Sequence, residues 1–130
     1  MEKTQRVLVV DDDPDLVESV KMMLENKNYE VITAYDGIEG LQKAKEDSPD
    51  LIILDVMMPN KDGYEVCHEL KADPQYNDIP ILLLTAVVSE MSKTTYTHRM
   101  GMEIDADDYI DKPVEPAELV KRAEALLQKG

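Results

Sequence analysis

The stretch Leu51-Ile52-Ile53-Leu54-Asp55 contains four consecutive apolar residues and ends in a carboxylate. An apolar run without polar alternation is typical of a strand that is buried on both faces, as in the centre of a parallel sheet. A second run, Val7-Leu8-Val9-Val10, also ends in acids, at Asp11 and Asp12. The two stretches together predict an α/β domain in which two central strands carry acids at their carboxyl ends.

The three acids are predicted to share one site. In open parallel sheets, ligands bind beyond the carboxyl ends of the strands, where the strand order reverses. Asp11, Asp12 and Asp55 would converge there, and their charges would repel one another unless a cation joined them. Oxygen-only ligands suit Mg²⁺ that keeps part of its water shell. We therefore expect Mg²⁺ at this edge, with Mn²⁺ as a possible substitute.

The charge of the chain limits its partners. Its 130 residues fit a single domain with a substantial core. The formal net charge of -14 would repel nucleic acid phosphates and anionic lipids. We expect no direct contact with nucleic acid, and partners that are proteins or cations.

Cysteine usage and hydropathy point to the cytoplasm. The single cysteine, Cys67, excludes an internal disulfide, and the first residues show no signal-peptide pattern. No apolar stretch approaches the roughly 20 residues that a membrane-spanning helix needs. The chain is therefore predicted to be cytoplasmic, without membrane insertion.

Strand-like and helix-like segments alternate five times along the chain, which is typical of α/β proteins. Strands are expected over residues 6–10, 29–33, 51–54, 80–84 and 106–110. Helices are expected after Asp13-Pro14, after Asp36-Gly37, after the turn that ends in Gly63, and from Glu115-Pro116. The region between Val87 and Gly101 is expected to be helical in part.

Two further strand ends add chemistry to the acidic edge. Thr85-Ala86 ends the fourth strand, and Asp111-Lys112-Pro113 ends the fifth. A hydroxyl and an ammonium group would thus join the acids and the cation, and Ala86 would keep the edge open by its small size. An ionised Asp can attack phosphorus when the charge on the phosphoryl oxygens is neutralised. This combination predicts a phosphoryl site.

In these motifs the chain resembles the receiver domain of the two-component response regulators, and the resemblance covers essentially all of its residues. The matching segments are Val9-Val10-Asp11-Asp12-Asp13, Leu54-Asp55-Val56-Met57-Met58-Pro59-Asn60-Lys61-Asp62-Gly63, Leu84-Thr85-Ala86 and Ala106-Asp107-Asp108-Tyr109-Ile110-Asp111-Lys112-Pro113. The resemblance implies a flavodoxin-like, doubly wound sheet of five parallel strands in the order 2-1-3-4-5.

The resemblance also implies roles for the residues at the edge. Asp55 is the phosphoacceptor, which becomes an aspartyl phosphate, and Lys112 contacts the phosphoryl group. Asp12, Asp55 and the backbone carbonyl of Met57 bind Mg²⁺ directly, whereas Asp11 acts mostly through water. The phosphoryl donor is a phosphohistidine on a sensor histidine kinase or a phosphotransfer protein.

A switch is implied as well. Thr85 and Tyr109 resemble the family's switch pair, in which the hydroxyl moves toward the phosphoryl group and the aromatic ring turns inward. The Lys112–Pro113 peptide bond is expected to be cis. Two features depart from the family: the stretch between Thr85 and Lys112 is longer, and Asp105 stands where a glycine usually precedes Ala106.

We interpret residues 1–130 as one receiver domain without an output domain, because Lys129-Gly130 directly follow the last helix. It would act as a phosphoprotein in signal transduction, as a monomer or a phosphorylation-dependent dimer that contacts a downstream protein target. It would not be an enzyme beyond its own phosphorylation and slow dephosphorylation. The alternative is a scaffold of the same fold that works without phosphorylation. A flavin carrier would need a phosphate loop in place of Asp11-Asp12-Asp13-Pro14, and a phosphohydrolase would need an acid in place of Met57.

Overall fold

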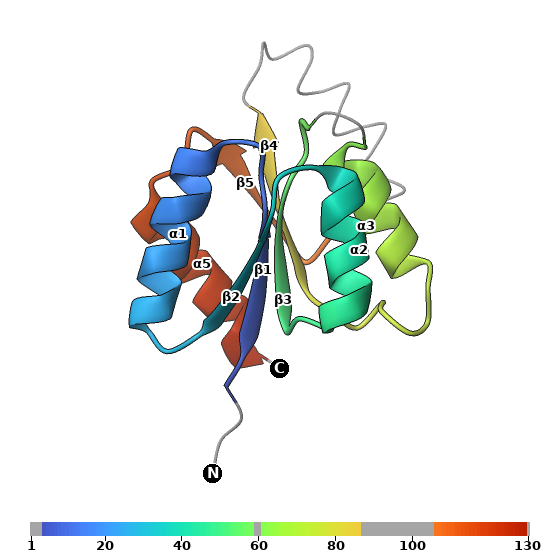
Figure 1. Cartoon of the computed structure of the whole chain (residues 1–130), viewed down its shortest axis with the longest axis horizontal. Coiled ribbons are helices and arrows are strands. Elements are labelled where there is room, and N and C mark those ends of the chain that lie inside the picture. Colours follow the sequence, from blue (N-terminus) through green and yellow to red (C-terminus); the bar gives the residue numbers. More distant parts are fainter. Residues whose placement is uncertain (1–3, 59–60, 87–105, 130) are drawn as a thin grey trace.

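The computed structural model describes residues 4–58, 61–86 and 106–129. They form a central five-stranded sheet with α1 and α5 on one face and α2 and α3 on the other (Figure 1). The strands are β1 (Arg6–Val10), β2 (Glu30–Ala34), β3 (Leu51–Asp55), β4 (Ile81–Ala86) and β5 (Asp108–Lys112). The helices are α1 (Pro14–Asn26), α2 (Gly37–Asp47), α3 (Gly63–Lys71) and α5 (Pro116–Lys129).

The strand order is β2-β1-β3-β4-β5, and every neighbouring pair is parallel. This confirms the predicted flavodoxin-like topology. The order reverses between β1 and β3, so the connections that leave these two strands pass to opposite faces of the sheet (Figure 1). The crevice expected at such a reversal lies beyond the carboxyl ends of β1 and β3.

Each of three helices begins at an aspartate that follows a strand. Asp13 caps α1 by accepting hydrogen bonds from two backbone amides, and Pro14 occupies the first turn. Asp36 caps α2 and Asp62 caps α3, each accepting from the amide three residues later. A carboxylate at this position satisfies an otherwise unpaired amide and complements the helix dipole. Local sequence therefore fixes where these helices start, and α1 follows Asp13 as predicted.

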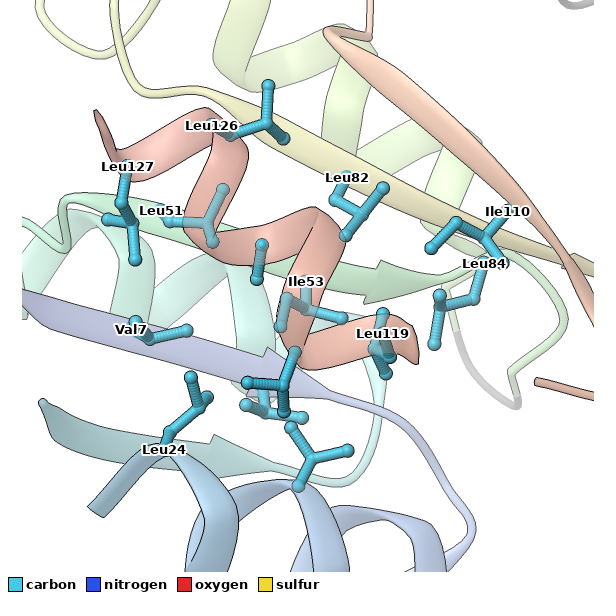
Figure 2. Close-up of a cluster of buried hydrophobic side chains, with 14 of the residues drawn as sticks. Val7, Leu24, Leu51, Ile53, Leu82, Leu84, Ile110, Leu119, Leu126 and Leu127 are labelled. Carbon is cyan, nitrogen blue, oxygen red and sulfur yellow. The ribbon is translucent and has the colours of Figure 1, made fainter. Parts of the chain in front are cut away.

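The core explains why the strand sequences lack polar alternation. Successive side chains of a strand point to opposite faces, so Val7 and Val9 pack toward α1 and α5, whereas Leu8 and Val10 pack toward α2 and α3. Figure 2 shows the first of these clusters, in which Leu51, Ile53 and the C-terminal helix residues meet. Both faces of the central strands are covered, as the apolar runs predicted.

Some predicted boundaries were wrong by one or two residues. The fifth strand covers Asp108–Lys112 rather than residues 106–110, and the fourth begins at Ile81 and reaches Ala86 rather than covering residues 80–84. The reason is their pairing, because β5 stays hydrogen-bonded to β4 up to the partners Ala86 and Lys112. The second strand covers Glu30–Ala34 instead of residues 29–33, in register with β1.

The expectations for Val87 to Gly101 and for Asp105 fall outside the described residues. Within the described ranges, no helix combines the length and apolar character needed to cross a membrane.

Candidate functional site

The carboxyl ends of three strands bring the predicted site together. Asp11 follows β1 directly, Asp55 is the last residue of β3, and Lys112 is the last residue of β5. One carboxylate oxygen from each of Asp11, Asp12 and Asp55 lies within 4.8 Å of the others. The predicted convergence of the acids is thus present, although Asp11 and Asp55 are 44 positions apart in the chain.

Lys112 connects the two buried acids. Its Nζ lies 2.8 Å from Oδ2 of Asp11 and 3.4 Å from Oδ1 of Asp55. The other oxygen of Asp11 accepts a hydrogen bond of 2.9 Å from the amide of Asp13. Asp11 is 0 % and Asp55 2 % exposed, whereas Asp12 is exposed. Lys112 is therefore closer to Asp11 than to the expected phosphoacceptor.

Burial dominates the electrostatics of these groups. Loss of water and the neighbouring Asp11 carboxylate raise the pKa of Asp55 to about 6, although Lys112 opposes the shift. Burial also raises the pKa of Asp11. Burial disfavours the charge of Lys112, but its contacts with both carboxylates outweigh this effect and raise the pKa of Lys112. Lys112 alone therefore does not offset the cost of burying the two negative charges of Asp11 and Asp55.

The donor set fits a hard divalent cation. Fully ionised, the three carboxylates carry two more negative charges than Lys112 can balance. The atoms offered are all oxygens, which Mg²⁺ and Mn²⁺ prefer over softer ligands. The acidic cluster of Asp11, Asp12 and Asp55 could hold such an ion.

The predicted switch residues lie on the two last strands. The hydroxyl of Thr85 donates a hydrogen bond of 2.6 Å to Oδ1 of Asp111 on β5. Tyr109, also on β5, is 41 % exposed. Asp111 had no predicted role beyond its place at the strand end, and no local sequence pattern marks it as a partner of Thr85, because the two residues are 26 positions apart.

The other site residues lie at the same edge. Ala86 ends β4 opposite Lys112. Met57 follows two residues after Asp55 and is 49 % exposed. The Lys112–Pro113 bond is cis. The roles expected for Ala86 and for the carbonyl of Met57 stay predictions.

The family model described as the response regulator receiver domain matches residues 7–124. The chain belongs to this family. Receiver domains are the signal-receiving modules of two-component response regulators, so the resemblance seen in the strand-end motifs is confirmed.

Curated and solved relatives agree with this membership. The receiver domain is 45% identical to the alkaline phosphatase synthesis transcriptional regulatory protein PhoP of Bacillus subtilis, over 97% of this chain and 50% of that protein. A crystal structure of a putative response regulator from Chloroflexus aurantiacus has a TM-score of 0.81 and 38% identity, covering 97% of this chain and 99% of that one. The chain spans about half the length of the curated relatives it matches.

A third relative was crystallised with a metal. The receiver domain of the sensor histidine kinase PA1611 from Pseudomonas aeruginosa holds a magnesium ion in its active-site cleft. It is 27% identical, has a TM-score of 0.80, and covers 97% of this chain and 99% of its own.

The buried charge of Asp55 predicts a pH dependence of stability in the absence of metal. The folded-state pKa of about 6 exceeds the ordinary value of 3.8, so the folded state binds the proton more tightly. This contribution is fully present below the ordinary value and is lost as the pH rises through about 6. Asp55→Asn should therefore be more stable than the parent at pH 7.5, by about 3 kcal/mol, and the difference should shrink toward pH 4.5. Urea unfolding in EDTA measures it. A difference that does not change with pH would contradict the pKa of Asp55.

Proposed function

We propose that this receiver domain is a Mg²⁺-dependent phosphoacceptor switch and that Asp55 receives the phosphoryl group. The observation that carries the proposal is the Asp55 carboxylate, which is almost completely buried at the tip of a central strand. It lies 3.4 Å from the Lys112 ammonium and belongs to the acidic cluster. No other acid of the cluster combines the end of β3 with these neighbours.

The phosphoryl donor would be a phosphohistidine of a sensor histidine kinase or a phosphotransfer protein. An oxygen of the Asp55 carboxylate attacks phosphorus, and the bond between phosphorus and the histidine nitrogen breaks. The nitrogen keeps the electron pair. With a proton on the other ring nitrogen of the phosphohistidine, the products are an aspartyl phosphate and a neutral imidazole. Lys112 would offset the negative charge of the phosphoryl oxygens. The protein acts on itself only, and we do not regard it as an enzyme with a separate substrate.

The residues that would hold Mg²⁺ are Asp12, Asp55 and the backbone carbonyl of Met57. When bound, the ion neutralises charge on the phosphoryl oxygens. Asp11 fits an indirect role, through water, because both of its oxygens already have partners. The magnesium ion in the active-site cleft of the related PA1611 receiver domain supports a magnesium site in this domain.

The output would be a change of surface. For Thr85 to reach a phosphoryl group on Asp55, its hydroxyl must leave Asp111. The space it vacates would allow the exposed ring of Tyr109 to turn inward, which converts a local charge change into a packing change. The changed surface would bind a downstream protein in the cytoplasm. The receiver domain itself would be a monomer or a phosphorylation-dependent dimer. If a longer protein contains this chain, we propose that the same phosphorylation controls the activity of that protein.

The proposal is tested by incubating the protein with acetyl phosphate and Mg²⁺ and recording its intact mass. We expect a gain of one phosphoryl group that hydroxylamine removes, since this nucleophile cleaves acyl phosphates, and no gain when EDTA replaces Mg²⁺. A scaffold that works without phosphorylation would show no gain in either condition. That result, with a correctly folded protein, would reject the phosphoacceptor function.

A further inference from the structure

The position of β5 is weakly specified by apolar packing. It pairs with β4 alone among the described strands, and Ile110 is its only buried residue. A strand register is strongly fixed only where a one-residue shift would expose a buried face. Other contacts must therefore determine how β5 lies along β4.

One such contact comes from α3. The ammonium group of Lys71, the last residue of that helix, lies 3.0 Å from Oδ2 of Asp107. It also donates to the carbonyl oxygens of Asn77 at 3.2 Å and Ile79 at 3.0 Å, in the connection to β4. Its side chain is only 16 % exposed. A lysine held by three oxygens at this depth has lost most of its freedom to seek other partners.

Asp107 in turn holds the start of β4. The same Oδ2 atom accepts a hydrogen bond of 2.8 Å from the amide of Ile81, and the Asp107 amide donates to the Ile81 carbonyl at 2.9 Å. Asp107, the residue before β5, is thus hydrogen-bonded to the first residue of β4. Lys71 connects Asp107 to α3. Asp108, the next residue, makes a two-armed contact with Arg122 of α5. Successive side chains point to opposite faces, so the strand is fixed from both helix layers at its start.

The far end of the same strand carries Lys112. In the observed register Asp108 pairs with Leu82 and Lys112 pairs with Ala86. A shift of one residue would move Lys112 by about 3.3 Å along the strand. This shift is comparable with the 2.8 Å distance from its ammonium group to Asp11. Lys112 can therefore meet the buried acids only if the start of β5 is held in place.

We propose that Lys71 is a positioning residue, which together with Asp107 holds β5 in the register that places Lys112 on the two buried acids. The effect on phosphoryl transfer rests on the proposed function, whereas the effect on the strand does not. Lys71 lies at the opposite end of β4 and β5 from the acidic cluster and acts only through the strand.

The test uses three variants of the whole chain. Lys71→Met removes the ammonium group, and Lys71→Arg keeps a cation that can bind the same oxygens. Lys43→Met is the matched control, because Lys43 also joins a helix to an edge strand: it donates to the Thr33 carbonyl of β2 at 2.7 Å and pairs with Glu39. Two quantities are measured in each variant: amide hydrogen exchange of β5 and the rate of phosphorylation by acetyl phosphate with Mg²⁺.

We expect Lys71→Met to speed exchange of the β5 amides at least about tenfold while β1 and β3 stay protected. Phosphorylation should slow by about tenfold, since a misplaced catalytic group costs rate. Lys71→Arg should restore both values, and Lys43→Met should change neither. If Lys71→Met does not fold, Asp107→Ala replaces it, with the same expected changes, because it removes the oxygen that accepts from both the Lys71 ammonium group and the Ile81 amide.

Two results would overturn the inference. Unchanged β5 exchange in Lys71→Met would show that the contact does not hold the strand. Faster exchange with an unchanged phosphorylation rate would show that the strand position does not govern Lys112. If the parent protein itself gains no phosphoryl group, the proposed function fails, and the exchange data still decide whether Lys71 holds β5.

Discussion

Asp55→Asn is expected to abolish the gain of a phosphoryl group completely. The amide has nearly the shape of the carboxylate, so the tip of β3 should keep its structure. It lacks the ionised oxygen that attacks phosphorus, and no other described acid lies at that position with the same neighbours. Intact mass after incubation with acetyl phosphate and Mg²⁺ measures the loss, and melting curves confirm that the variant is folded.

Asp13→Asn provides the matched control for this experiment. Asp13 lies at the same edge of the sheet, but its side chain is exposed and caps α1. Asparagine caps helices about as well as aspartate, so the control should be phosphorylated like the parent. If Asp55→Asn still gains a phosphoryl group, and peptide mapping places it on another aspartate, Asp55 is not the acceptor.

Gly63→Ala is expected to destabilise the fold by about 2–3 kcal/mol. Gly63 is the first residue of α3, and a Cβ placed there would overlap the backbone of Asp55 and Val56. Its amide donates to the Val56 carbonyl at 2.9 Å, which holds the helix start against the end of β3. The new methyl group must push the helix away from the strand that carries Asp55, and overpacking of this kind costs roughly 1–3 kcal/mol.

The direction of this effect is informative. A Gly to Ala substitution within a helix ordinarily increases the stability of the protein by roughly 0.5–1 kcal/mol, whereas a decrease is expected at Gly63. Gly40→Ala is the graded comparison: its Cβ would lie 2.8 Å from a methyl carbon of Val10, a side chain that can move more easily than backbone. Urea unfolding should therefore show a larger loss for Gly63→Ala than for Gly40→Ala. Equal losses, or a gain at Gly63, would contradict a backbone contact as the reason for glycine there.

Several features of the fold follow from short stretches of sequence. The unbroken apolar runs that end at Val10 and Leu54 identify central strands, because only a strand covered on both faces can lack polar residues. Asp13 and Asp36 mark helix starts, since a cap acts on amides only two or three residues away. These signals are local, and the structure confirms them.

The acidic edge could also be predicted, for a topological reason. Acids at the tips of parallel strands must meet at one edge when those strands are neighbours, as β1 and β3 are. The predicted set of Asp11, Asp12, Asp55 and Lys112 therefore came together. The sequence could not indicate that Lys112 would be closer to Asp11 than to Asp55.

Only the tertiary structure decided which distant side chains meet. Thr85 and Asp111 are 26 residues apart, and Lys71 and Asp107 are 36 residues apart. No periodic pattern links such positions. Their contacts depend on the register between β4 and β5, for which the sequence made no prediction. By itself, the sequence determined the order of elements and the acids at the strand ends, because both depend on neighbouring residues. The contacts of β5 were decided by tertiary packing, because an edge strand with one buried residue carries too little apolar pattern to fix its own position.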